Sequence, residues 1–294
     1  MDTRLKVNFP PDPNPRKPRL KVPVGAWDTH FHVIGPPHVF PYAETRHYTP
    51  PAAPVEHYLM MARVIGFERG VIVQPSVHDL DYAITLDAVA KSEGRLRGMI
   101  RADPRLTVAD LRNLHGKGVR GIRINLVGKL GGTFDEKNFN QVVSRAAEVN
   151  WVMALHVDPI SVVRFADVIR RMPTRTIVEN YALMDARDGV DQPALKALVD
   201  LAQEPHVWLK TASAYRMIFK GATYEQVVPI ARKVAACSPD RVIWGTDGPH
   251  SDVFEPGKMP NDGDLVDWLV DFVPDETARR KMLVDNPKRL FDFD

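Results

Sequence analysis

Two histidines, His30 and His32, lie one residue apart within an apolar and aromatic stretch of the sequence, residues 26–34. Such a stretch predicts a buried β-strand. Because successive side chains of a strand point to opposite faces, the two imidazoles share one face. On a buried face they need polar partners. These partners are either hydrogen-bonding groups of the core, or a shared metal ion, water or substrate.

A carboxylate and a third imidazole fall at the ends of other apolar runs. Asp247 ends residues 241–247, where an unpaired carboxylate would be costly to bury, and His156 ends residues 151–156. Together with His30 and His32 they form a ligand set that suits one divalent ion, Zn²⁺ or Mn²⁺. Such an ion lowers the pKa of a bound water to about 7. Without a metal, Asp247 could take a proton from a water that the histidines hold. Both alternatives stay open.

Further polar residues gather at the ends of the other predicted strands. They are Ser76 and His78; Arg123, Asn125 and Lys129; Glu179, Asn180 and Tyr181; Lys210, Thr211, Ser213, Tyr215 and Arg216; and His250. Those expected to bind a small anionic substrate are Ser76, His78, Arg123, Lys129, Asn180, Tyr181, Arg216 and His250. A loop over residues 35–54 adds Tyr48, and a loop this long in a compact domain is usually functional.

Several of these residues also have simpler structural interpretations. Asp158, which precedes Pro159, could cap the next helix. Lys210 could pair with Glu179, and Arg123 could belong to a structural ion pair. Loop-surface positions are the simpler interpretation for His78 and His250, and structural or surface positions for His38, His47, His57, His115 and His206.

The elements that must position these side chains alternate along the chain. Strands are predicted over residues 26–34, 70–76, 96–100, 119–125, 151–157, 174–179, 206–211 and 241–247, and helices over residues 55–65, 82–91, 107–115, 136–149, 161–171, 193–202, 224–237, 263–272 and 276–284. Short apolar runs without polar alternation are typical of a parallel sheet buried on both faces. The sequence therefore predicts an α/β protein with a single (β/α)8 TIM barrel, whose chemistry lies at the C-terminal strand ends. A doubly wound sheet is the alternative, although no G-x-G-x-x-G follows the first strand.

Domain organisation follows from composition. Residues 1–22 are polar and rich in proline, which predicts an extended N-terminal arm on the surface or on a neighbouring subunit of a homo-oligomer. Residues 23–294 form the predicted barrel domain. Residues 35–54 and 211–224 are the loops expected to select the substrate.

The overall charge and the cysteine count exclude several functions. A formal net charge of +2 over 294 residues argues against nucleic-acid or membrane-surface binding driven by bulk electrostatics. The single cysteine, Cys237, excludes an intrachain disulfide and is interpreted as a packing residue. No apolar run approaches the ~18 residues of a membrane span, and the first residues do not resemble a signal peptide, so a cytoplasmic location is expected.

Two motifs at opposite ends of the chain carry a resemblance to a known family. Residues 27–32 read WDTHFH and residues 244–250 read WGTDGPH. With the stretches at 46–50, 71–76, 120–125 and 281–290, they make the chain resemble the amidohydrolase superfamily, and within it the branch of 2-pyrone-4,6-dicarboxylate lactonases, from about residue 24 onward.

The resemblance implies a hydrolase that needs no metal and opens the ring of a small carboxylate-bearing lactone. Asp247 would be the general base, and His30 and His32 would place or polarise the scissile carbonyl. The implied substrate contacts are Arg123, Lys129 and Arg216 for carboxylates, with Tyr48, Ser76 and His250. An arginine suits a carboxylate because its planar fork can bind both oxygens.

The sequence departs from this branch at several places. Lys129 stands where the branch has an arginine, so it cannot offer the planar fork. Glu179-Asn180 and Leu183 stand where the branch has Asp-His and an arginine, which indicates a substrate with fewer or differently placed carboxylates. His156 replaces a tyrosine, and a histidine there is a metal ligand in decarboxylase relatives. A metal-dependent decarboxylase or hydratase of an aromatic-pathway acid is therefore the alternative function. A binding protein that has lost its chemistry is a third.

Overall fold

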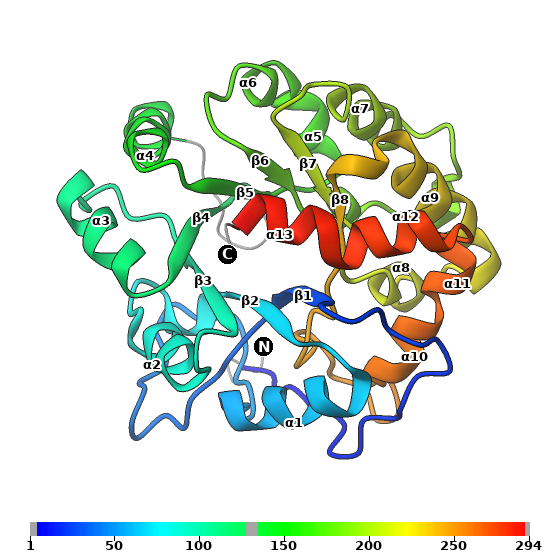
Figure 1. Ribbon diagram of the computed structural model, residues 1–294, viewed down its shortest axis with the longest axis horizontal. Helices are drawn as coiled ribbons and strands as arrows, with labels where there is room; N and C mark the ends of the chain where they lie inside the picture. The colour runs from blue at the N-terminus through cyan, green and yellow to red at the C-terminus, as the bar shows by residue number, and fades with distance from the viewer. Residues whose placement is uncertain (1–4, 128–134, 292–294) are drawn as a thin grey trace.

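The computed structural model describes residues 5–127 and 135–291. Eight parallel strands follow one another around a barrel in chain order, with helices outside them (Figure 1), which confirms the predicted (β/α)8 architecture. The strands are β1 (Trp27–Phe31), β2 (Arg69–Val73), β3 (Leu96–Arg101), β4 (Val119–Asn125), β5 (Val152–His156), β6 (Thr176–Val178), β7 (Val207–Lys210) and β8 (Val242–Ile243).

The barrel closes between β1 and the segment after β8. The predicted strand over 241–247 is only two residues long, since the chain beyond Ile243 crosses toward β1. There the backbone N–H and the hydroxyl of Thr29 both donate to the carbonyl of Trp244, at 3.0 and 2.8 Å. Gly245 permits this approach, because a Cβ at that position would lie 2.5 Å from the backbone nitrogen of His30. The closure therefore brings the loop that carries Asp247 onto the first strand.

The helices surround the barrel, and several differ from prediction. The predicted helix over 161–171 is two short helices separated at Phe165, and the C-terminal helices are connected by one π-helical turn. The α-helices are α1 (Val55–Ile65), α2 (Ala83–Lys91), α3 (Val108–Gly116), α4 (Glu136–Glu148), α5 (Pro159–Arg164), α6 (Ala166–Arg170), α7 (Pro193–Leu201), α8 (Tyr215–Phe219), α9 (Tyr224–Cys237), α10 (Asp262–Asp267), α11 (Leu269–Phe272), α12 (Glu276–Arg280) and α13 (Asn286–Phe291). Shorter 3-10 or π turns are η1 (Ser76–His78), η3 (Asn180–Leu183), η4 (Ala186–Asp188), η5 (Pro239–Arg241) and η6 (Lys281–Asp285). Among the described residues, no helix has both the length and the apolar character needed to cross a membrane.

The core has two layers, one inside the barrel and one between the barrel and its helices. Inside, apolar side chains from seven strands form a cluster with Leu290 and Phe291 of α13. This helix lies across one end of the barrel (Figure 1), where the ring of Phe291 stacks on Trp27 of β1. The barrel is thus filled and covered at this end.

The N-terminal arm packs on the chain's own barrel. Val7 forms a β-bridge with Thr49 in the loop after β1. The Asn8 side chain donates to the carbonyl of His250 at 3.2 Å and accepts from the N–H of Val253 at 2.7 Å. The arm therefore connects the loops that follow the first and the last strand.

Candidate active site

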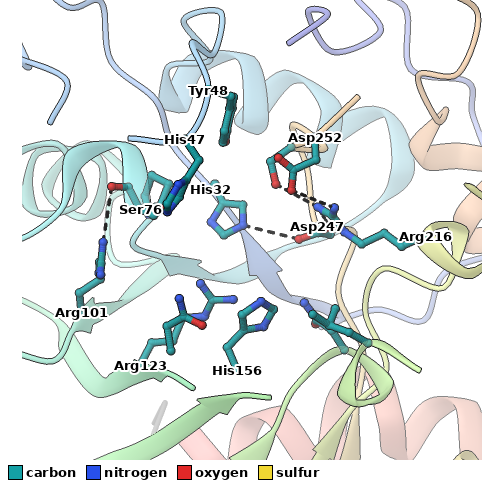
Figure 2. A pocket seen from close by; sticks show the side chains of 15 residues that line it. His32, His47, Tyr48, Ser76, Arg101, Arg123, His156, Arg216, Asp247 and Asp252 are labelled. Carbon is teal, nitrogen blue, oxygen red and sulfur yellow. Dashed lines mark hydrogen bonds and ion pairs between the residues drawn. The ribbon is translucent and has the colours of Figure 1, made fainter. Parts of the chain in front are cut away.

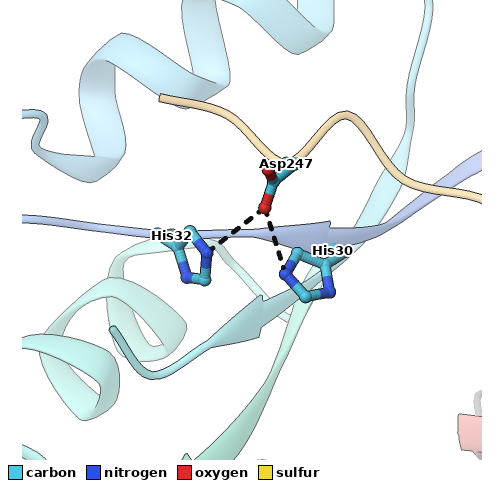
Figure 3. A group of neighbouring side chains, drawn as sticks. All are labelled: His30, His32 and Asp247. Atoms are coloured by element: carbon cyan, nitrogen blue, oxygen red, sulfur yellow. Dashed lines mark ion pairs between the residues drawn. The ribbon is translucent and has the colours of Figure 1, made fainter. Parts of the chain in front are cut away.

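Three predicted residues meet where β1 approaches the loop after β8. The Nε2 atoms of His30 and His32 lie 3.4 and 3.5 Å from Oδ1 of Asp247 (Figure 3). Both distances exceed a normal hydrogen bond. The two rings lie at 85° with their centroids 5.1 Å apart, and all three side chains are buried. The one-residue spacing in the sequence therefore places both imidazoles against a single carboxylate oxygen.

The carboxylate of Asp247 is held rigidly through its other oxygen. Oδ2 accepts hydrogen bonds from the Tyr215 hydroxyl at 2.6 Å and from Nε and Nη2 of Arg216 at 3.1 and 3.0 Å. The backbone of Asp247 is in the left-handed region, with φ of 66°, and its N–H donates to the carbonyl of His30 at 2.8 Å. Burial raises the pKa of this carboxyl, but Arg216 and the two histidines outweigh burial and hold it well below its ordinary value. Oδ1 is thus left as an ionised acceptor facing the imidazoles.

The two histidines present different nitrogens to Asp247. Nδ1 of His32 lies 2.7 Å from the carbonyl oxygen of Val73, which only accepts, so Nδ1 carries the proton and Nε2 is bare. Burial lowers the pKa of His32, which keeps the ring neutral near pH 7. Nδ1 of His30 lies 3.3 Å from the ammonium of Lys210 and 3.5 Å from Oε1 of Glu179. With Nδ1 accepting from the nearer ammonium, Nε2 carries the proton and faces Asp247. One imidazole accepts and the other donates.

A buried ion-pair network lies behind His30. Glu179 accepts from Lys210 at 3.1 Å and from Nε of Arg123 at 2.7 Å, so both predicted structural pairs are present. Burial opposes the charge of Glu179, but Arg123 and Lys210 outweigh it and hold its pKa well below the ordinary value. His156 lies 3.7 Å from the same carboxylate, and burial together with Arg123 lowers its pKa well below the ordinary value. At neutral pH His156 is therefore an uncharged ring.

A pocket opens above these groups at the C-terminal ends of the strands (Figure 2). Arg101 and Ser76 lie on one side of it, and Asp247, Arg216 and Asp252 on the other. Its lining residues are His32, His47, Tyr48, Pro75, Ser76, Arg101, Arg123, Asn125, His156, Asn180, Leu183, Arg216, Asp247, Ser251 and Asp252.

Comparison with known proteins identifies the family of this chain. The model of the amidohydrolase family matches residues 27–293. The chain belongs to this family. A 4-sulfomuconolactone hydrolase of Hydrogenophaga intermedia is 43% identical over 93% of this chain and 90% of its own length. A 2-pyrone-4,6-dicarboxylate hydrolase of Comamonas testosteroni is 34% identical over 95% and 93%. The structure also resembles that of a putative 2-pyrone-4,6-dicarboxylic acid hydrolase from Pseudomonas putida, with a TM-score of 0.79 and 25% identity over 93% and 100% of the two chains.

Not all predicted site residues of this amidohydrolase lie in the pocket. His30, His78, Tyr181 and His250 are outside its lining, although His30 contacts Asp247 from beneath it, and Lys129 lies outside the described residues. The loop-surface interpretation of the two histidines is wrong, because both are buried. Nδ1 of His78 contacts the carbonyl of Pro41 at 3.2 Å, and Nε2 of His250 lies 3.2 Å from Asp262. Asp158 caps α5, as its simpler interpretation predicts, by accepting from the N–H of Ser161.

Sequence reasoning missed several lining residues and one supporting residue. Arg101 ends β3, and its place at a C-terminal strand end was sufficient to find it. His47, assigned to a structural or surface role, also lines the pocket, as do Leu183, Ser251 and Asp252. The sequence places Tyr215 after the seventh strand but does not reveal that its hydroxyl supports Asp247, because this contact depends on how α8 folds back over the barrel.

The site also fits a divalent metal ion. Ligand atoms of His30, His32 and Asp247 all lie within 4.8 Å of one another. Coordination through Nε2 of His30 would require the ring proton to move to Nδ1, where Oε1 of Glu179 lies 3.5 Å away. His32 donates its second ring N–H to a backbone carbonyl, as metal-ligating histidines do. Three protein ligands with an open position are typical of catalytic zinc sites. His156, predicted as a fourth ligand, is not part of this group, because its ring lies toward Glu179.

Proposed function

We propose that this amidohydrolase is a hydrolase that opens the ring of a small lactone carrying carboxylate or other anionic groups. The relatives named above are lactone hydrolases, and their names describe substrates with a sulfo group or two carboxylates. The single observation that carries the proposal is the arrangement of Asp247, in which Oδ2 is held by three donors while Oδ1 faces two imidazoles.

The reaction begins with a water between Oδ1 of Asp247 and Nε2 of His32. Both atoms accept hydrogen bonds, so the water donates both hydrogens and turns a lone pair toward the pocket. Asp247 takes one proton as the oxygen attacks the lactone carbonyl. Although its low pKa makes Asp247 a weak base, its fixed position removes the entropic cost of bringing base and water together.

The negative charge that develops on the carbonyl oxygen needs donors. The guanidinium of Arg123 lines the pocket and can stabilise the oxyanion. Nε2–H of His30, which is buried beneath the pocket 3.4 Å from Oδ1 of Asp247, would be the second donor. Collapse of the tetrahedral intermediate breaks the ring C–O bond, and Asp247 returns its proton to the leaving oxygen. The product of adding water to the lactone is the ring-opened hydroxy acid, or its keto tautomer where the leaving oxygen is that of an enol.

The anionic groups of the substrate find cations and hydroxyls in the pocket wall. Arg216 lies beside Asp247, and Tyr48, Ser76 and Asn180 also line the pocket. Arg216 already donates to Asp247, so a substrate carboxylate there would share its guanidinium. His156 contributes an uncharged polar ring to the floor of the site.

A metal-dependent variant of this site is the second candidate, favoured by the orientation of His32. His30, His32 and Asp247 would hold Zn²⁺ or Mn²⁺, which when bound activates water and polarises a carbonyl. The alternative decarboxylase or hydratase function requires this ion.

The test uses the purified protein before and after chelation. Loss of ultraviolet absorbance of 2-pyrone-4,6-dicarboxylate, and ring opening of muconolactones, would be measured together with elemental analysis. We expect lactone hydrolysis by the metal-free protein. Absence of turnover on every lactone, with decarboxylation restored by Zn²⁺ or Mn²⁺, would favour the second candidate instead.

A further inference from the structure

Two arginines stand side by side on the pocket wall across from Asp247. Arg101 and Arg123 are direct partners in the register of β3 and β4, at the C-terminal ends of both strands, and both line the pocket (Figure 2). Only Arg123 is tied to the catalytic groups, through Glu179. Arg101 contacts none of the proposed catalytic residues, and therefore needs a separate explanation.

The contacts of Arg101 engage one end of its guanidinium. Nη1 lies 2.9 Å from Oδ1 of Asp79 and 3.5 Å from the carbonyl of Ser76. Within the part of the chain that the structure describes, Nε and Nη2 have no acceptor among the hydrogen bonds of this residue. The side chain is 30% exposed, and the residue lines the pocket.

The surroundings of Arg101 favour an anion. Burial lowers the pKa of its guanidinium, and the nearby charge of Arg123 lowers it further, although Asp79 opposes both effects. Two neighbouring cations repel each other in a partly dry site, and an anion between them removes that repulsion. The Ser76 side chain in the same wall can add a neutral donor.

We propose that Arg101, together with Arg123 and Ser76, binds an anionic group of the substrate at the end of the pocket remote from Asp247. A carboxylate or a sulfonate both fit, because each offers two or more oxygens to the paired guanidiniums. Arg101 thereby joins Arg123 and Ser76, which the family resemblance already implies as substrate contacts, and a second anionic group would lie near Arg216. This inference rests on the proposed function only for the placement of the reacting carbonyl.

Three variants separate binding from a merely structural role. Arg101→Gln removes the charge, Arg101→Lys keeps the charge but not the planar fork, and Asp79→Asn removes only the ion-pair partner. Asp79 lies outside the pocket lining, and asparagine tolerates its positive φ of 44°. Each variant would be assayed on 2-pyrone-4,6-dicarboxylate and on 2-pyrone-6-carboxylate, which lacks one carboxylate.

For Arg101→Gln we expect KM for the dicarboxylate to rise about 10- to 100-fold, which is about 1.4 to 2.8 kcal/mol. We expect kcat to stay within about threefold, and the monocarboxylate to lose much less. Arg101→Lys should recover part of the loss, and Asp79→Asn should not reproduce it. Equal losses on both substrates, or the same KM for Asp79→Asn and Arg101→Gln, would overturn the proposal.

A binding measurement keeps this test independent of catalysis. Citrate, a small polyanion with no lactone, would be titrated calorimetrically into the wild type and into Arg101→Gln. We expect an affinity at least tenfold weaker in the variant. If no lactone is turned over, the proposed function fails while this titration still decides the role of Arg101. Unchanged affinity, or no citrate binding by the wild type, would refute the anion site.

Discussion

Asp247→Asn tests the proposed mechanism at its centre. The amide would keep its oxygen toward Tyr215 and Arg216, since these donors lie 2.6 to 3.1 Å from Oδ2. Its NH₂ group would then replace Oδ1 and point at the bare Nε2 of His32, 3.5 Å away. The shape of the site and its hydrogen bonds to Arg216 are retained, but the atom that accepts the proton from water is replaced by a donor.

The expected loss follows from what this oxygen does. A positioned general base contributes about 10²- to 10⁴-fold to a rate, so kcat for lactone hydrolysis should fall by that factor. KM should change little, because Asp247 does not bind the anionic groups. The assay is steady-state hydrolysis of 2-pyrone-4,6-dicarboxylate, with circular dichroism and thermal unfolding measured on the same preparations.

Asp240→Asn is the matched control. Asp240 lies before β8, is exposed, and pairs with Lys281 at 2.8 Å. The same chemical change there should leave kcat unchanged. Turnover of Asp247→Asn within tenfold of the wild type, with both variants folded, would refute the assignment of Asp247 as the base.

Three further predictions concern the barrel, the arm and the single thiol. Gly245→Ala should destabilise the fold by about 1–3 kcal/mol and reduce activity, because the new Cβ would press on the His30 backbone 2.5 Å away; an unchanged melting temperature and kcat would contradict this. Asp267→Asn should lower stability at pH 7 by about 1–3 kcal/mol. Burial raises the pKa of Asp267, but the Leu20 N–H, Arg16 and Arg19 outweigh it, so the folded pKa is below the unfolded one, and denaturation curves of variant and wild type should converge as the pH falls below about 4. Burial raises the pKa of the Cys237 thiol to about 11. At pH 8 the thiol should therefore react with iodoacetamide much more slowly in the folded than in the unfolded protein, which mass spectrometry would measure.

The barrel and the centre of the site were predictable because they depend on local patterns. Short apolar runs fix the strands, and the spacing of His30 and His32 fixes their common face. Once the barrel is assumed, Asp247 must lie beside them, since the first and last strands are neighbours. The position of Arg101 in the site was equally predictable, because this residue ends the third strand.

Other features of the site depend on how the loops fold back over the barrel, and no local sequence pattern predicts the path of a loop. The hydroxyl of Tyr215 reaches Asp247 only because α8 begins directly over the barrel mouth. His78 and His250 follow strand ends and yet lie outside the pocket lining, His78 beside the carbonyl of Pro41 and His250 beside Asp262 at the start of α10. The four residues of η3 all have φ between 49° and 54°, an arrangement that ordinary side chains disfavour and that places both Asn180 and Leu183 in the pocket wall.

The attachment of the N-terminal arm has a consequence for how substrate enters. Asn8 forms hydrogen bonds with the backbone of His250 and Val253, and Val7 forms a β-bridge with Thr49. One short extended segment therefore contacts both the loop that carries Tyr48 and the loop that carries Asp252. Spreading these loops apart requires breaking hydrogen bonds to the arm. Entry of a bulky lactone between these loops is thereby linked to the detachment of Val7 and Asn8 from them.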